Sequence, residues 1–280
     1  MSNDMLLAEG QSKGSRLRKI WFVVVLLFIL VTGVIVLYYL LNKDLNFETY
    51  KTVVGKTTEN SLGSLTLNEV IVDDNQVLLN ATFKPEKDTH FEYQIFFFPQ
   101  VLINGKEFTV RNGGQSIAQS DKTYTIYSSV KLSELPKDET LNLDIRYNDW
   151  NGKKAIDEPW NFQVEASQKQ LQEDRNVFSV KKKVKLIDGQ QITIDKVVST
   201  PISTTIYFHS DTALNDAIQF NIQSRSGELW RIDAAYPLNE GYTKWGVRLD
   251  SLYLTEKSYH LIPIATGGND LGSKIKITKK

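Results

Sequence analysis

A long apolar segment near the N-terminus constrains this chain more than any other feature. The segment begins at Ile20, ends at Leu41, includes Trp21 and Leu30, and carries no charged, proline or amide residue. A helix of about 22 residues rises roughly 33 Å at ~1.5 Å per residue, enough to cross a hydrocarbon core of ~30 Å. We therefore predict a membrane anchor, a transmembrane helix over residues 20–41, with the lipid bilayer as its first partner.

The charges beside the apolar segment predict its orientation. A cluster of basic residues comes directly before it, namely Lys13, Arg16, Arg18 and Lys19. The residues directly after it are mixed in charge, so the positive-inside bias places the N-terminus in the cytoplasm and the rest of the chain outside. A cleaved signal peptide is the alternative. The apolar run exceeds the ~7–15 residues of a signal peptide, however, and no small-residue cleavage site follows it. We expect a single-pass cell-membrane protein.

Composition excludes several classes of function. Lys plus Arg and Asp plus Glu both count 33, so the formal net charge is zero, and no basic stripe predicts a nucleic-acid partner. The chain has no cysteine, which excludes disulfides, Cys-zinc sites and thiol catalysis. An exported protein without cysteine fits a Gram-positive envelope better than an oxidising eukaryotic lumen.

Beyond the apolar segment the sequence alternates between apolar and polar residues with period two. Residues 65–72 and 76–83 show this strand pattern on either side of a polar turn, Asp73-Asp74-Asn75. Asn104-Gly105 and Asp188-Gly189 each predict a hairpin, because both residue pairs tolerate positive φ. Residues 112–114, Asn-Gly-Gly, indicate a further turn. No convincing 3.6-residue period occurs after the anchor, so we expect this part to be mostly β.

The two halves of the β region resemble each other. Residues 65–83 match residues 192–208 in pattern, and VKLSEL at 130–135 matches VRLDSL at 247–252. We therefore predict an all-β fold of two tandem immunoglobulin-like β-sandwich domains behind one N-terminal transmembrane helix. The alternative is a chance likeness between β sequences. The expected segments are a cytoplasmic tail (1–19), the transmembrane helix (20–41), a stalk (42–62), the first sandwich (63–166), a connector with one or two helical turns (167–176) and the second sandwich (177–280).

The turns and strand edges also suggest a family. The DDNQ turn, INGKEF, VKLSELPKDETLNLDI and WNFQVEAS resemble the extracytoplasmic domain of Gram-positive anti-sigma-factor-like membrane proteins, a domain of unknown function (DUF4179-type). The segment ITIDKVVSTPISTTIYF resembles the sandwich that commonly follows it (DUF5643-type). The resemblance implies a single-pass protein linked to envelope-stress signalling. Anti-sigma members hold the sigma factor with a folded cytoplasmic segment, and the tail over residues 1–19 shows neither a helical pattern nor zinc-ligand spacing.

The sequence offers no convincing catalytic, metal or cofactor site. The three histidines, His90, His209 and His260, are far apart and lack metal-ligand spacing. The turn at Asp73 lacks the distal Glu of a calcium loop, so we interpret it as turn chemistry. A GxSxG match at residues 10–14 lies in the tail, without the strand and helix that this motif needs. The SxxK matches lie on predicted strands, where residues three apart point to opposite faces.

Aromatic and basic residues remain as candidates for binding. The tryptophans at 150, 160, 230 and 245 could line a groove, although core packing explains them better. Lys181, Lys182 and Lys183 form a possible surface contact for an anionic wall polymer or lipid, or a solvated strand edge.

Three functions follow as hypotheses from these patterns. The first is a non-catalytic binding or sensing module whose partner is an envelope protein or a cell-wall polymer, linked to anti-sigma-like regulation. The second is a structural or assembly factor of the bacterial envelope. The third, an extracytoplasmic hydrolase, ranks last because no nucleophile, base or metal set is visible.

Overall fold

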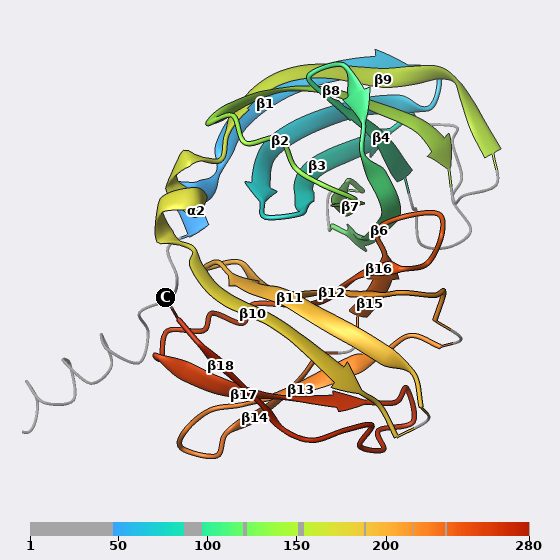
Figure 1. Cartoon of the computed structure of the whole chain (residues 1–280). Coiled ribbons are helices and arrows are strands. Elements are labelled where there is room, and N and C mark those ends of the chain that lie inside the picture. The colour runs from blue at the N-terminus through green and yellow to red at the C-terminus, as the bar shows by residue number, and fades with distance from the viewer. Residues whose placement is uncertain are drawn as a thin grey trace, which may run out of the picture. The chain divides into compact units, whose positions relative to one another are not determined.

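The computed structural model describes residues 47–86, 97–119, 122–150, 154–187, 189–214, 216–232 and 234–279. The predicted cytoplasmic tail and the predicted anchor over residues 20–41 lie outside this set. Among the described residues, no helix is both long enough and apolar enough to cross a bilayer. Phe47–Lys280 form one compact unit, whose regular secondary structure is almost entirely antiparallel β-sheet in the described residues (Figure 1).

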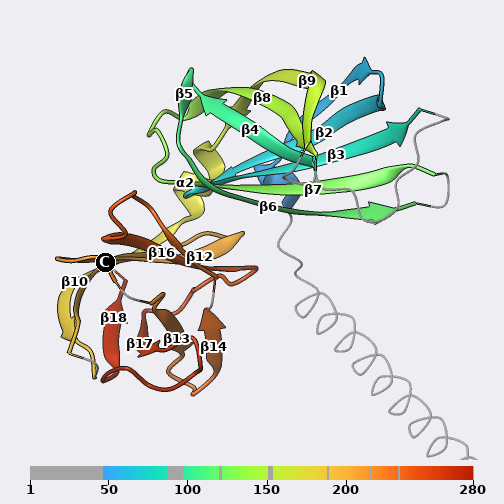
Figure 2. The same ribbon diagram turned by 90° about the vertical axis from the view of Figure 1, so that its right-hand side faces the viewer.

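The first half of this unit contains two sheets that face each other. One has the strand order β1-β2-β3-β7-β6 and the other β5-β4-β8-β9 (Figure 2). The 3-10 helix η1 (Phe47–Tyr50) precedes them. The strands are β1 (Thr52–Asn60), β2 (Gly63–Asp73), β3 (Gln76–Pro85), β4 (Phe97–Ile103), β5 (Lys106–Glu107), β6 (Thr109–Ala118), β7 (Tyr124–Leu132), β8 (Thr140–Trp150) and β9 (Lys154–Ser167).

The second half repeats this arrangement after the short helix α2 (Lys169–Asp174). Its sheets have the orders β10-β11-β12-β16-β15 and β14-β13-β17-β18. The strands are β10 (Asn176–Lys185), β11 (Gln191–Ser199), β12 (Ser203–Ser210), β13 (Gln219–Gln223), β14 (Leu229–Ile232), β15 (Ala234–Pro237), β16 (Lys244–Asp250), β17 (Ser258–Ile264) and β18 (Ile275–Thr278). Adding nine to each strand number of the first half gives the strand orders of the second.

Local irregularities repeat along with the topology. The pairing of β1 with β2 shifts register between Val53 and Lys56, and the pairing of β10 with β11 shifts between Ser179 and Lys182. Within these bulges Gly55 adopts a φ of 63° and Lys181 a φ of 45°. A bulge twists an edge strand and limits edge-to-edge association. The internal repeat predicted from the sequence is therefore present in the strand order and in the bulges.

Each half has its own hydrophobic core. The period-two pattern places alternate side chains between the two sheets, as in β2, where Leu65 and Leu67 are fully buried. One core draws on residues 65–166 and the other on residues 178–277. The predicted all-β class with sandwiched antiparallel sheets is confirmed for the described residues.

Both predicted hairpins occur. Asn104 and Gly105 form the two-residue turn between β4 and β5 with φ values of 50° and 76°, as a type I′ turn requires. β10 and β11 pair as antiparallel neighbours across the turn that contains Gly189. Asp188 of that turn lies outside the described residues.

Two expectations from the sequence were wrong. Residues 52–60, which we placed in a stalk, form β1, the edge strand paired with β2. The Asn-Gly-Gly at 112–114 is not a turn but part of β6. Gly114 lies so close to β7 that an added Cβ would be 2.6 Å from the Tyr127 carbonyl oxygen, so a side chain would clash there. The connector does contain a short helix, α2, as predicted.

Candidate functional site

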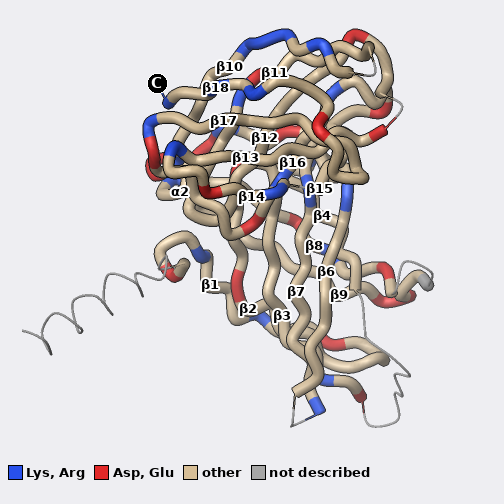
Figure 3. The backbone as a smooth tube through the Cα atoms, turned by 90° about the horizontal axis from the view of Figure 1, so that it is seen from below, with Lys and Arg blue, Asp and Glu red and all other residues tan. Residues whose placement is uncertain are grey.

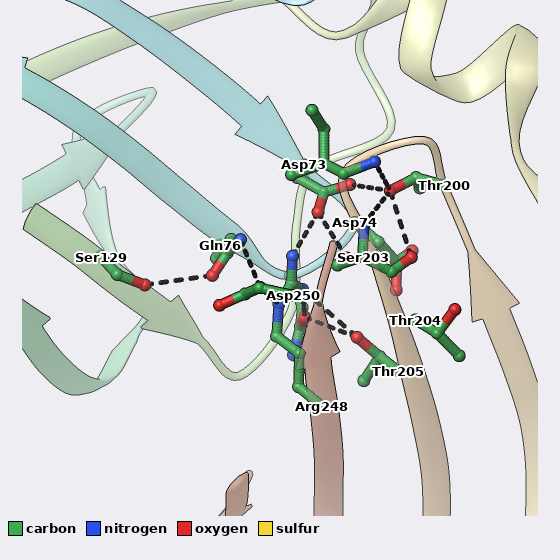
Figure 4. Close-up of polar contacts among 12 residues, drawn as sticks. Asp73, Asp74, Gln76, Ser129, Thr200, Ser203, Thr204, Thr205, Arg248 and Asp250 are labelled. Atoms are coloured by element: carbon green, nitrogen blue, oxygen red, sulfur yellow. Dashed lines mark hydrogen bonds and ion pairs between the residues drawn. The ribbon is translucent and has the colours of Figure 1, made fainter. Parts of the chain in front are cut away.

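The turn between β2 and β3 makes the main polar contact between the two halves. Asp73 ends β2, Gln76 begins β3, and the turn contacts β12, β16 and the β11–β12 turn of the second half (Figure 4). Asp73, Asn75 and Gln76 are each at most 2 % exposed, although all three are polar. Buried polar groups need hydrogen-bond or ion-pair partners, so this turn requires complementary donors and acceptors on the second half.

Asp73 finds those partners on the second half. Its carboxylate pairs with the Arg248 guanidinium and accepts hydrogen bonds from the Thr200 hydroxyl at 2.8 Å and the Ser203 hydroxyl at 2.6 Å. The side chains of Arg248 and Asp73 are 1 % and 0 % exposed. The pair is therefore a fully buried ion pair that links the two sandwiches.

Arg248 uses its remaining donors on both halves. Its Nη1 donates to the Asn75 Oδ1 at 2.8 Å, and its Nε donates to the Asp250 Oδ1 at 2.8 Å. Burial alone would lower the pKa of the Arg248 guanidinium, but Asp73 and Asp250 outweigh burial and raise this pKa above its usual value. Arg248 therefore stays charged within the interface.

Further contacts complete what we call the junction cluster. Asn75 donates to the Tyr236 hydroxyl at 2.5 Å, and Gln76 donates to Asp250 at 3.3 Å. The junction cluster consists of Asp73, Asn75, Gln76, Thr200, Ser203, Tyr236, Arg248 and Asp250. Breaking a buried ion pair on one side costs much more than the pair contributes in net stability. Removing either partner of the Asp73–Arg248 pair would therefore leave an unpaired charge buried between the two sandwiches.

Lys131 on β7 lies at the border of this cluster. Its ammonium group donates to the Gln76 side chain and lies 3.8 Å from an oxygen of Asp250. Burial, together with the nearby positive charge of Arg248, lowers the pKa of Lys131 from 10.5 to about 8. The folded protein therefore releases this proton more readily than the unfolded chain does.

This shift predicts a pH dependence of stability. Between about pH 8 and pH 10 the unfolded chain keeps the Lys131 proton while the folded chain loses it, so the free energy of unfolding should rise with pH. In the Lys131→Met variant this rise should be smaller. Denaturant titrations of both proteins at several pH values in that range measure the difference. Equal slopes for the two proteins would contradict the assignment.

A cleft of about 580 Å³ opens beside the junction cluster. Both sandwiches and the connector contribute its walls. The lining includes Asp74 and Asn75 from the β2–β3 turn, Lys137 from the β7–β8 loop, Gln172 and Arg175 from the connector, and Lys196, Thr200 and Tyr207 from the second sandwich. Asn75 and Thr200 belong to both the cleft and the junction cluster, so a molecule in this cleft would contact groups that hold the sandwiches together.

The wall of the cleft carries an unusual acid–phenol pair. The Tyr207 hydroxyl donates to the Asp74 carboxylate, and the Lys196 ammonium lies 4.5 Å from the centre of the Tyr207 ring. Burial raises the pKa of Asp74 despite the hydrogen bond from Tyr207. Burial and the charge of Asp74 also raise the pKa of Tyr207 well above its ordinary value. The cleft lining therefore combines two carboxylates, Asp74 and Glu134, with three cationic side chains, Lys137, Arg175 and Lys196.

The connector, which forms one wall of the cleft, is held in place by hydrogen bonds to its neighbours. The Asp174 side chain accepts a hydrogen bond from Tyr50 at 2.9 Å, and its backbone carbonyl accepts one from Tyr253 at 2.7 Å. Gln168 is 3 % exposed and donates to the carbonyls of Pro136 at 2.7 Å and Asp138 at 2.6 Å. The connector is thus bonded to both sandwiches and to the loop that lines the cleft.

The structure places the residues predicted from the sequence in different regions. The Asp73-Asp74-Asn75 turn is confirmed as a turn, but its role at the junction was not foreseen. Trp160 and Trp245 are buried in the two cores and Trp150 and Trp230 pack against them, as expected for packing residues. The lysines at 181–183 are exposed on the edge strand β10. Lys13, Arg16, Arg18 and Lys19, with the anchor residues Ile20, Trp21, Leu30 and Leu41, lie outside the described residues.

The described residues show no assembled catalytic or metal site. No group of three or more His, Cys, Asp or Glu side chains within them is arranged to hold a metal ion. His209 contacts the Asp195 carboxylate at 3.0 Å and is 40 % exposed, while His260 lies on β17. The GxSxG match at 10–14 lies outside the described part of the chain.

Comparisons with known proteins give a fold but no family. No protein-family model matches the chain, and no curated protein matches it. The chain is similar to a solved structure titled as a conserved domain protein from Bacillus anthracis, with a TM-score of 0.58 and 15% sequence identity over 78% of each chain. At this identity the likeness supports the β-sandwich fold alone.

Proposed function

We propose that this chain is a membrane-anchored, extracytoplasmic binding module that senses an envelope component through the junction cleft. The observation that carries the proposal is the composition of the cleft wall. Residues from both sandwiches form it, and two of them, Asn75 and Thr200, also belong to the buried junction cluster. A ligand that contacts both sandwiches at such a site can alter how firmly they are held together.

The apolar segment over residues 20–41 supports the location. It has the length and composition of a transmembrane helix, and the basic residues before it favour an exterior position for residues 47–280. We propose that the two halves are immunoglobulin-like domains behind this anchor. Such domains act as exposed binding modules in many unrelated proteins, so the fold is compatible with this function.

The chemistry of the cleft supports binding rather than turnover. Its lining carries three exposed cations, Lys137, Arg175 and Lys196, against two carboxylates, Glu134 and Asp74, of which Asp74 is already engaged by Tyr207. This excess of cations favours an anionic or partly anionic ligand. We propose that this ligand is an envelope component and that the output is envelope-stress regulation, as the anti-sigma-like resemblance implies.

Site-specific photo-crosslinking in cells tests the binding proposal. A benzophenone-bearing amino acid replaces Gln172, which lines the cleft, or Lys84, which is exposed at the end of β3 opposite the β2–β3 turn, in the full-length chain. The change at Gln172 should give a discrete adduct that the change at Lys84 does not. Adding Arg175→Ala to the first chain should weaken the adduct.

Two results would contradict the cleft as a binding site. One is a set of equal adducts at positions 172 and 84, which would indicate random collision. The other is the absence of any adduct at position 172 while the chain is present at its normal level.

A further inference from the structure

The second sandwich has one edge whose charges are all positive. Strand β10 carries Lys181, Lys182, Lys183 and Lys185, all exposed, and contains no Asp or Glu. A long basic segment along this strand is visible in Figure 3. β10 is the outer strand of its sheet, so these side chains stand at an open edge.

A second basic strand lies beside this one. β10 and β18 are in contact, and the Ile187 amide donates to the Leu271 carbonyl at 2.8 Å just beyond them. β18 is the outer strand of the other sheet, and its neighbourhood supplies the exposed residues Lys274, Lys276 and Lys279. We call these seven lysines on and beside β10 and β18 the basic edge.

Few acidic groups offset this charge among the described residues nearby. Lys183 lies 4.0 Å from Asp211, with both side chains more than 70 % exposed, and Lys274 donates to the neutral Gln223 at 2.8 Å. Glu256 lies with Lys276 in a depression of about 520 Å³ that Arg225 and Lys257 also line. An ion pair as exposed as Lys183–Asp211 contributes little, so it leaves the ammonium group available.

The charge is also segregated along the chain. Residues 169–280 hold 16 Lys and Arg against 12 Asp and Glu, whereas residues 47–168 hold 12 against 18. A formal net charge of zero therefore hides a basic second sandwich and an acidic first one. The field of the whole protein would orient a polyanion toward the second sandwich.

The spacing of the lysines favours a linear partner. Lys183 and Lys185 are two residues apart on β10, so they share a face with their charges roughly 7 Å apart. Lys276 is exposed on β18, and Lys274 directly precedes that strand. Repeated charges in a row match a chain of regularly spaced phosphates. No aromatic residue is exposed on β10 or β18 to stack a base, so the row favours a polymer without bases.

We propose that the basic edge binds a linear phosphate polymer. The basic edge is separate from the junction cleft, so this proposal can fail while the cleft proposal stands, and the reverse. Multiple weak lysine–phosphate contacts add along a polymer, which explains how exposed lysines along a strand edge can produce affinity.

Binding of labelled long-chain inorganic polyphosphate to the full chain in neutral-lipid nanodiscs tests this proposal. The test variant replaces Lys182, Lys183 and Lys185 with glutamine. The control variant replaces three exposed lysines of the first sandwich, Lys56, Lys84 and Lys106, and removes the same charge. The test variant should bind at least about tenfold more weakly and with a flatter salt dependence, while the control should stay within about twofold of the original chain.

Comparison ligands identify the partner. Oligothymidylate of equal charge and vesicles containing an anionic lipid are measured with the same proteins. Tighter binding of oligothymidylate would overturn the assignment to a polymer without bases. Binding of anionic vesicles but not of polyphosphate would assign the surface to a membrane instead. Equal loss in the test and control variants, with unchanged thermal unfolding, would show that only overall charge matters and would also overturn the proposal.

Discussion

Replacing Arg248 with methionine is expected to lower the free energy of unfolding by roughly 3–5 kcal/mol, because it leaves the Asp73 carboxylate buried without its cation. Asp73 keeps its hydrogen bonds from Thr200 and Ser203, but two neutral hydroxyls do not neutralise a charge at 0 % exposure. Denaturant titration followed by circular dichroism measures the loss. The variant should also unfold in two steps, since each sandwich has its own core.

The matched control is Asp250→Asn. The Asp250 side chain also accepts from Arg248, but it is 57 % exposed, so its loss should cost less than about 1 kcal/mol. Adding Asp73→Asn to Arg248→Met removes the unpaired charge and should recover part of the stability. If Arg248→Met cost no more than Asp250→Asn, the buried pair would not be holding the sandwiches together.

Replacing Trp160 with alanine is expected to cost roughly 3–5 kcal/mol, because it removes the largest side chain from the first core. The Trp160 ring packs edge-on against Phe97 at 5.0 Å and Phe83 at 5.5 Å between ring centres. Its indole nitrogen donates to the Gly63 carbonyl at 3.1 Å. The same denaturant titration measures the effect, and the step assigned to the first sandwich should shift most.

Trp230→Ala provides the comparison. Trp230 is only partly buried against the second core and packs on Tyr259 at 6.3 Å between ring centres. Its replacement should cost clearly less, because less cavity is left behind. Equal costs for the two tryptophans would contradict the assignment of Trp160 to the centre of its core.

The sequence predicted the strands wherever alternation was strong. Residues 65–72 alternate cleanly, and they lie in β2 with one face in the core. β1 was missed because its sequence, TVVGKTTEN, carries Gly55 and polar residues, and none of its side chains is fully buried. An edge strand with both faces partly in water lacks the contrast on which a period-two signal depends.

The junction could not be predicted in the same way. Asp73 and Arg248 are 175 residues apart in the chain, and each looks like an ordinary polar residue in its own segment. Arg248 stands between Val247 and Leu249, the pattern of an outward-facing strand residue. The Arg248 side chain is buried only because the other sandwich supplies the β2–β3 turn, whose Asp73 carries the opposite charge. Sequence patterns record which face a residue occupies, and only the tertiary structure shows what covers that face.

The proposed function depends above all on which side of the membrane residues 47–280 occupy. Because the chain contains no cysteine, single substitutions give unambiguous labels. Asp157→Cys, at an exposed position on β9, and Ser12→Cys, in the predicted cytoplasmic tail, are each treated in intact cells with a membrane-impermeant maleimide. We predict labelling of the Asp157→Cys chain in intact cells and of the Ser12→Cys chain only after permeabilisation. The opposite pattern, or labelling of neither chain until the cells are opened, would contradict the proposal.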